Sequence, residues 1–578
     1  MDRKPHSTGS LPGSAKPVRL HRVTAQEDDH SERVPPTAGA ASGRGVSRSV
    51  GAWTVLLLLL YSAGLTRDLS APWVGMHDWN GAFFSQLARN FLRYPVSVHH
   101  GMPIVAAGES VPPVEERSIY ATHPPGLVWL VAVVFKVFGE SEAVARLVPI
   151  LASLGALALL IWLVSRAYGS ATAILAGLIY AAMPMSVYFG RMVDHEAICL
   201  AAMLAAVAAW CVLTDRTVKR RTRAAALAGW MAAVSVGVWV DWSAVLFVGL
   251  FCGYVIMLVA RGLVARRLAA LLVVFVGEVT VGMICFIVYA GLDGAWGDFV
   301  PIFLSRSTEK ARLLEQGHMG SAWGHTLGNL TWPVVILSLC GLVISLGDWD
   351  RRRPKPTVRQ HQSLQRDRRI PSGASAARDG LGLVLLTGIL WVAVFWRQYQ
   401  VHNYWLFYMG PAAAVFSARA LLWLWRRLSL IGSLPAHGCV AAVLLVTLGL
   451  ELRGASAYFD RTSAELALRI EDWKQVRGMT SPGDRVVLYH DPFKTEERGG
   501  YRFRNLVPPQ LAYYLDRPMA VESDFAKVAE NRDRGVVFVL SKANAVIHGE
   551  ALRALRVRFR EIPLAREVVF DLRGRPAE

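Results

Sequence analysis

The sequence predicts a polytopic α-helical membrane protein with about eleven transmembrane helices and a C-terminal α/β domain. Of its 578 residues, 53% are hydrophobic and only 18% are charged, and the mean hydropathy is +0.33. This composition is too apolar for a soluble globular protein. The apolar residues form blocks of about 17–23 residues, long enough to cross a bilayer. Each block must be helical, because lipid cannot satisfy the hydrogen bonds of the backbone.

Basic residues between the apolar blocks predict the orientation of the helices. With a cytoplasmic N-terminus, the inner loops include 214–223, 261–267 and 348–379, which are rich in Lys and Arg, as the positive-inside rule requires. The apolar stretch 124–138 is short for a span, and we expect a helix along the outer surface there. The expected spans, within a transmembrane domain at 51–452, are 51–66, 144–165, 170–189, 196–213, 223–240, 243–260, 268–290, 328–347, 380–396, 404–425 and 434–452.

Three regions lie outside the spans. Residues 1–50 are rich in Arg, Ser, Gly and Pro without hydrophobic periodicity, which predicts a disordered cytoplasmic tail. Residues 67–143 form a long first outer loop. Residues 453–578 contain strand-like runs at 485–490 and 535–540 with helix-compatible sequence between them, which predicts an extracytoplasmic α/β domain.

The net charge of +18 does not indicate a nucleic-acid partner, because Lys and Arg are concentrated in short loops between apolar blocks. All six cysteines lie within apolar blocks, so the sequence offers neither a disulfide framework nor a CxxC metal site. Walker A, Rossmann and GxSxG motifs are not evident. A site on the outer side would lack nucleotide sugars, so a sugar donor there would have to be carried by the membrane.

An acidic residue follows the first predicted span. Asp78, next to His77, lies near the membrane surface, where partial desolvation raises the proton affinity of a carboxylate and suits a general base. The alternative is a solvated loop acid or a helix cap, and Asn80 is a plausible N-cap of the helix that follows.

Further ionisable residues stand at the outer ends of later spans. Asp194, His195 and Glu196 share one short loop, where three ionisable groups are costly without a function. The alternative is a capping acid at a helix start, and a metal site is weakly indicated because the HExxH spacing is absent. Asp241 lies between two apolar blocks and either ends a helix or faces the same outer cavity.

Histidine, tyrosine and basic residues complete the candidate site. His123 precedes two prolines and either contacts a lipid phosphate or is structural. His402, Tyr404 and Tyr408 recur at helical spacing, as expected for a binding groove or for an interfacial aromatic belt. An outer basic patch contains Arg306 and Lys310, and it indicates either a bound lipid phosphate or a solvated helix.

Several ordered motifs resemble the GT-C superfamily of membrane glycosyltransferases. These are HDWNGAFFSQLARNFLRYP, THPPGLVWLVAVVFKVFGESEAVARLVPIL and SVYFGRMVDHEAICLAAMLAA, together with HNYW and its following Tyr and Pro at 402–411. The likeness covers about residues 50–260. It is nearest to the protein O-mannosyltransferases and lipid A aminoarabinose transferases, glycosyltransferase families 39 and 83.

The resemblance implies an inverting sugar transfer from a polyprenyl-phosphate donor on the outer face of a bacterial inner membrane. Asp78 resembles the first-loop acid, Asp194 the second acid, and His123 stands where some relatives carry a phosphate-binding Lys. Many relatives place the first acid about two residues further on, where this chain has Asn80. In the expected mechanism Asp78 is the base and Asp194 positions the acceptor or a supporting cation.

The sequence leaves several points open. The acceptor is a lipid, a polysaccharide or a protein of the cell envelope, and the only cofactor indicated is a divalent cation. A lipid or solute transporter and a non-enzymatic scaffold with an exterior binding domain are the alternative functions. A transporter would need polar residues along the span interiors, whereas the ionisable residues here stand mostly at outer ends.

Overall fold

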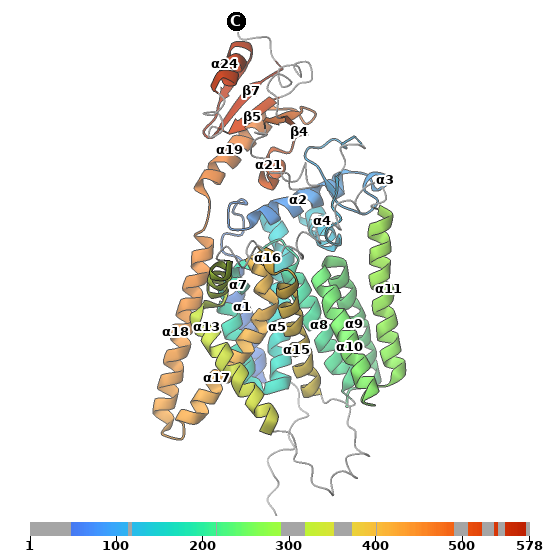
Figure 1. The fold of residues 1–578 in the computed structure, drawn as a ribbon, viewed down its shortest axis with the longest axis vertical. Helices are drawn as coiled ribbons and strands as arrows, with labels where there is room; N and C mark the ends of the chain where they lie inside the picture. The colour runs from blue at the N-terminus through green and yellow to red at the C-terminus, as the bar shows by residue number, and fades with distance from the viewer. Residues whose placement is uncertain are drawn as a thin grey trace, which may run out of the picture. The chain divides into compact units, whose positions relative to one another are not determined.

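A computed structural model shows the fold of most of the chain (Figure 1). Residues 1–47, most of the predicted tail, lie outside the described residues. The structure describes residues 48–113, 118–215, 217–290, 318–351, 373–399, 402–489, 507–522, 537–541 and 549–573.

The described residues include nine helices long and apolar enough to cross a membrane. Each coincides with a predicted span, so the prediction of a polytopic helical membrane protein is confirmed. The nine helices are α5 (Glu142–Tyr168), α8 (Glu196–Thr214), α9 (Arg220–Val240), α10 (Trp242–Ala260), α11 (Arg266–Ala290), α13 (His318–Arg351), α15 (Gly373–Val394), α17 (Gly410–Leu428) and α18 (Ser433–Phe459).

The two remaining predicted spans form shorter helices. The first is α1 (Arg48–Leu65). The second, predicted as one helix over 170–189, is broken into α6 (Ser170–Ala182) and α7 (Pro184–Phe189). Met183 is extended, with φ −59° and ψ 130°, because the proline that follows it disfavours helical backbone. Prediction of one continuous helix there was therefore wrong.

The helices of the first outer loop lie across one end of the long transmembrane helices (Figure 1). The predicted surface helix is α4 (Gly126–Phe138), whose 13 residues are too few to span a bilayer. Asn80 is not an N-cap, because α2 begins before it. The other elements of this loop are α2 (Asp78–Arg93), α3 (Val96–His99) and the antiparallel strands β1 (Ile104–Val105) and β2 (Ser118–Ile119).

The C-terminal region contains a five-stranded sheet of order β4-β3-β5-β7-β6. β3 pairs in parallel with β4 and β5, and β7 runs antiparallel to β5 and β6. Both predicted strand runs form strands. The strands are β3 (Val486–Tyr489), β4 (Met519–Glu522), β5 (Val537–Ser541), β6 (Arg560–Pro563) and β7 (Glu567–Asp571), and the helices are α19 (Ala464–Met479), α21 (Pro509–Leu515) and α24 (Gly549–Arg558).

An ion-pair cluster joins α21 to the outer helix α2. The fully buried Asp516, just after α21, accepts hydrogen bonds from Arg93 at 2.8 and 2.9 Å and from Arg477 at 3.1 Å. The guanidinium of Arg89 donates to the backbone oxygen of Tyr513 at 2.8 Å. Charge-assisted and bidentate bonds of this kind are the stronger hydrogen bonds in proteins. The C-terminal domain is thereby fixed against the elements that build the site.

Close helix packing gives a test of the fold. A Cβ atom at Gly341 in α13 would collide with the backbone of Phe416 in α17, whereas one at Gly347 in the same helix would meet nothing within 4 Å. We expect Gly341→Ala to lower the thermal unfolding midpoint in detergent, at a cost of about 1–3 kcal/mol. Gly347→Ala is the matched control and should be neutral or slightly stabilising, because Ala favours helix. Equal midpoints for the two variants would contradict this packing.

Candidate functional site

A cavity of about 330 Å³ lies where the predicted outer segments meet. Its wall comes from α2, the segment before α4, the start of α8, the α9–α10 turn and the loop after α16 (Trp396–Tyr399), where a 3₁₀ helix, η2 (Asn403–Met409), begins. Three residues of the C-terminal region, Val507, Pro509 and Ala512, close another side. Segments far apart in sequence thus bring polar and aromatic side chains to one space.

Asp194 is a buried carboxylate of this cavity that Asn80 and His195 hold in place. It is only 6% exposed, and its Oδ2 accepts a hydrogen bond from the amide of Asn80 at 2.5 Å. Its Oδ1 lies 2.7 Å from Nδ1 of His195 and accepts the backbone N–H of the same residue at 2.9 Å. These partners fix the orientation of a buried carboxylate, as a catalytic acid or base requires.

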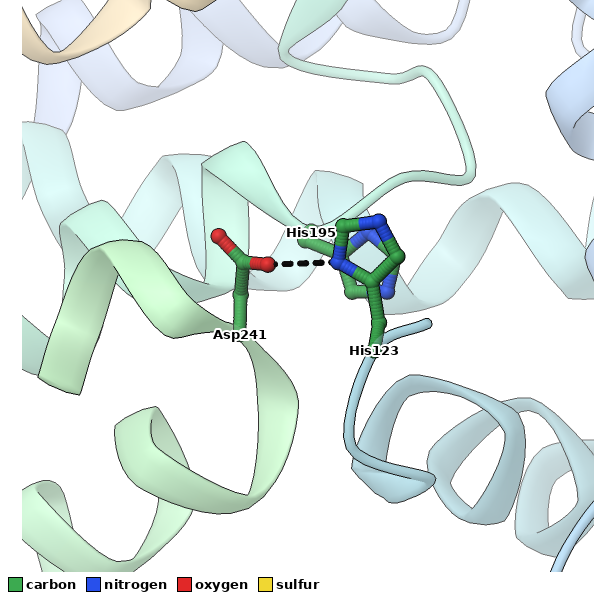
Figure 2. Close-up of side chains that lie close together, drawn as sticks. All are labelled: His123, His195 and Asp241. Atoms are coloured by element: carbon green, nitrogen blue, oxygen red, sulfur yellow. Dashed lines mark hydrogen bonds and ion pairs between the residues drawn. The ribbon is translucent and has the colours of Figure 1, made fainter. Parts of the chain in front are cut away.

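A second aspartate–histidine pair lies beside the first. Nδ1 of His123 is 2.7 Å from Oδ1 of Asp241, as the dashed line in Figure 2 marks. The His123 ring stacks on His195, with centroids 4.5 Å apart and planes 18° apart. Burial alone would raise the pKa of Asp241, but the hydrogen bond and charge of His123, with the charge of His195 and the hydrogen bond of the Ser243 side chain, hold it below its usual value.

His123, His195 and Asp241 could hold a metal ion. Their potential ligand atoms all lie within 4.8 Å of one another. Nε2 of His195 is buried and has no hydrogen-bond partner among the described residues, so one donor atom is uncommitted. Two imidazoles and a carboxylate suit Zn²⁺ or a similar divalent ion. This set differs from the Asp194–Glu196 run that the sequence suggested.

Aromatic residues around η2 form another part of the cavity wall. Nδ1 of His402 lies 2.6 Å from the hydroxyl of Tyr404, and that hydroxyl accepts from the Asn80 amide at 3.3 Å. The His402 ring also stacks on Trp405, at a centroid distance of 4.9 Å. A polar network therefore connects this wall to Asp194 through Asn80.

Two predicted site residues lie behind this wall. Tyr408 is fully buried and shares a 2.7 Å hydrogen bond with Ser243. His77 lies 3.0 Å from the side-chain oxygen of Asn403 and meets the Tyr404 ring edge-on, and burial lowers its pKa. Neither lines the cavity, so both support the site from behind.

The remaining predicted residues have different positions. Glu196 lines the cavity, and its Oε2 has no partner among the residues described. Asp78 does not line this cavity. It faces a separate small pocket, where its Oδ2 accepts the Gly75 N–H at 2.9 Å and lies 3.5 Å from Arg146, and burial raises its pKa. Two further predicted residues, Arg306 and Lys310, lie outside the described residues.

Sequence reasoning missed Asn80 as a cavity residue and missed the contribution of α21. The signal for Asn80 was its position, which corresponds to the first acid of many relatives. No local signal marked Pro509 or Ala512, because their role depends on how α21 docks against α2.

Comparison with solved structures identifies the fold. ArnT from Cupriavidus metallidurans, solved bound to undecaprenyl phosphate, matches over 91% of this chain and 98% of its own, with a TM-score of 0.55 and 14% identity. The chain has the GT-C fold. An oligosaccharyltransferase of Archaeoglobus fulgidus in the apo form matches over 91% and 75% of the two chains, with a TM-score of 0.53 and 12% identity.

A sequence family supports the same assignment for part of the chain. Residues 122–288 match the family described as dolichyl-phosphate-mannose-protein mannosyltransferase. With the structural matches, this confirms the resemblance to the GT-C superfamily. A comparison with curated protein sequences gave no match.

The lowered pKa of Asp241 provides a test of its pairing with His123. A carboxylate with a depressed folded-state pKa stabilises the protein above its unfolded value of about 4, and this contribution is lost as the pH falls through the folded-state pKa. We expect Asp241→Asn to destabilise the protein at pH 7 by about 3–5 kcal/mol, the cost of breaking a buried pair. Thermal unfolding should show this difference narrowing below pH about 4.

The control for this test is Asp460→Asn, because the Asp460 side chain is 69% exposed. It should leave the midpoint nearly unchanged at every pH. A difference for Asp241→Asn that widens on acidification would contradict the pairing.

Proposed function

We propose that this protein transfers a sugar from a polyprenyl-phosphate donor to an acceptor hydroxyl in the cavity around Asp194. The observation that best supports this transfer is the buried carboxylate of Asp194. It lies beside the stacked rings of His195 and His123, in a cavity at the ends of membrane spans. The GT-C fold supports this reading, because the ArnT structure contains undecaprenyl phosphate and an Archaeoglobus fulgidus structure contains dolichol-phosphate.

In this proposal Asp194, rather than Asp78, accepts the proton of the acceptor hydroxyl. The acceptor oxygen forms a bond to the anomeric carbon while the bond from that carbon to the phosphate oxygen breaks. The polyprenyl phosphate leaves with the bonding electrons, and a single displacement inverts the anomeric configuration. Asn80 and His195 orient the carboxylate throughout. The assignment rests on position, since Asp78 does not line the cavity.

The two histidines of the cavity can donate hydrogen bonds to the leaving phosphate. His123 and His195 line the cavity, and Asp241 orients the His123 ring through their hydrogen bond. A divalent cation held by His123, His195 and Asp241 would neutralise phosphate charge as a Lewis acid. Arg306 and Lys310 remain predicted phosphate contacts.

Two parts of the cavity wall suggest where the donor sugar and the acceptor bind. His402, Tyr404 and Trp405 offer aromatic faces and polar atoms to a donor sugar. The residues around α21 line the side that adjoins the C-terminal domain, and we place the entry of a lipid, polysaccharide or protein acceptor of the cell envelope on that side. Basic inner loops support an extracytoplasmic site with a cytoplasmic N-terminus. We assign the chain to a bacterial inner membrane from its likeness to ArnT of Cupriavidus metallidurans.

Paired aspartate variants test the assignment of the base. We expect Asp194→Asn to reduce transfer by about 100-fold or more, because a general base contributes on that scale. Asp78→Asn should retain much more activity, although it can affect folding. The measurement is mass spectrometry of envelope glycans and polyprenyl-phosphate sugars in a deletion strain carrying each variant. Normal glycans with Asp194→Asn but not with Asp78→Asn would reverse the assignment.

Metal content gives an independent test of the histidine pair. If His123, His195 and Asp241 hold a divalent ion, His195→Ala should reduce the metal bound to purified protein to background, because a three-ligand site loses one donor. Elemental analysis after exposure to zinc or manganese measures this. Glu196→Gln is the neighbouring control and should retain metal, since Glu196 is outside the trio. Equal metal content in both variants would argue against the site.

A further inference from the structure

A second, smaller pocket lies beside the N-terminal end of α2. Its volume is about 110 Å³, and none of its lining residues lines the larger cavity. Asp78 and Tyr188 contribute to it, as do two arginines, Arg146 near the start of α5 and Arg191 just after α7. Asp78, which the sequence predicted to be the catalytic base, therefore belongs to a different pocket.

Arg146 is held in place mainly by neutral groups. Its side chain is 3% exposed, and Nη1 donates to the backbone oxygens of Leu69 and Ala71 at 2.7 and 2.6 Å. The guanidinium stacks 4.2 Å from the centroid of the Trp73 ring. Asp78 is 3.5 Å from Nη2, a long distance for a charge-assisted bond. These contacts fix the guanidinium without closely neutralising it.

Arg191 has an uncommitted donor. It is 6% exposed, its Nη2 donates to the backbone oxygen of Asp68 at 2.9 Å, and its guanidinium lies 5.2 Å from the centroid of the Phe459 ring. Its Nη1 is buried and has no hydrogen-bond partner within the described part of the chain. Burial and the positive charge of Arg146 lower its pKa to about 10. A water could satisfy the donor, but water would not offset the charge.

The buried charges of the pocket favour an anion. Both guanidiniums are buried, whereas of the two lining carboxylates Asp68 is 61% exposed and pairs with Arg67 at 3.5 Å. The other carboxylate, Asp78, also accepts a backbone N–H from Gly75. Buried cations are stable only when they are paired. Guanidinium forks bind phosphate oxygens through two parallel hydrogen bonds, which suits a pair of arginines.

We propose that this pocket binds a phosphate group through Arg146 and Arg191. The pocket is lined by residues near the ends of α5, α7 and α18, and α5 and α18 are long and apolar enough to cross a membrane, so the group comes either from a membrane lipid headgroup or from free phosphate. Binding does not depend on the transferase activity proposed above. Arg191 is three residues from Asp194, and Asp78 is two from Asn80, so a bound phosphate also fixes the two segments that carry the Asn80–Asp194 hydrogen bond.

The test is phosphate binding by the purified full-length protein in detergent. Inorganic phosphate is titrated at constant ionic strength while the thermal unfolding midpoint is recorded, and we expect a saturable rise. Arg191→Gln should weaken the apparent affinity at least about tenfold, because a charge-assisted contact is lost. His123→Ala should keep the response, since His123 belongs to the larger cavity. This control separates the pocket from phosphate bound at the proposed catalytic site.

A second variant keeps the test decisive if Arg191→Gln does not fold. Thr462 is exposed on the pocket wall, and Thr462→Glu places a tethered carboxylate there. It should raise the unfolding midpoint without phosphate and abolish the phosphate response, because the added carboxylate supplies the missing anion.

Phosphatidic acid and a diacylglycerol with the same chains distinguish the source of the phosphate. Stabilisation by phosphatidic acid alone, lost in Arg191→Gln or Thr462→Glu, identifies a lipid headgroup, whereas a response to inorganic phosphate alone identifies the free ion. Either result supports the pocket. The absence of any saturable response, or a response that both variants retain, overturns the proposal.

Discussion

Two aspartate–histidine pairs with buried carboxylates hold the site together. Asp194 pairs with His195, Asp241 pairs with His123, and the two imidazoles stack at 4.5 Å. The pairs join the segment before α4, the start of α8 and the α9–α10 turn. Because an unpaired charge in a low-dielectric interior is costly, these groups stabilise one another only if the three segments meet. The remaining cavity residues are placed around this contact.

Much of the fold could be predicted from hydropathy and charge. Span positions follow from the length of apolar segments, and the surface helix α4 follows from being too short. Sequence also predicted that Asp194, Asp241, His123 and His402 would share one side, because three of them adjoin the outer ends of spans and His123 lies in the first outer loop. All four line the same cavity. The break at Met183 was missed, although Pro184 was visible in the sequence.

The assignment of roles within the site depended on long-range contacts that no local pattern reveals. Asp78 is drawn into a second pocket with Arg146 and Arg191, and Asn80, two residues later, faces Asp194 instead. Two positions in a helix differ by about 200° around its axis, so they face nearly opposite sides. Sequence could therefore predict which segment contributes to the cavity. It could not predict which side chain of that segment enters the cavity.

The packing of α21 on α2 gives the cavity a composite wall. Its carboxylates and imidazoles are carried by segments that fold with the transmembrane helices, whereas Pro509 and Ala512 belong to a region with its own β-sheet. Mutations in that region can reshape one part of the wall while the carboxylates and imidazoles keep their positions. If the proposed transfer is correct, such a division lets acceptor preference diverge among related proteins without renewed selection on the donor chemistry, much as exchangeable loops diversify a rigid scaffold.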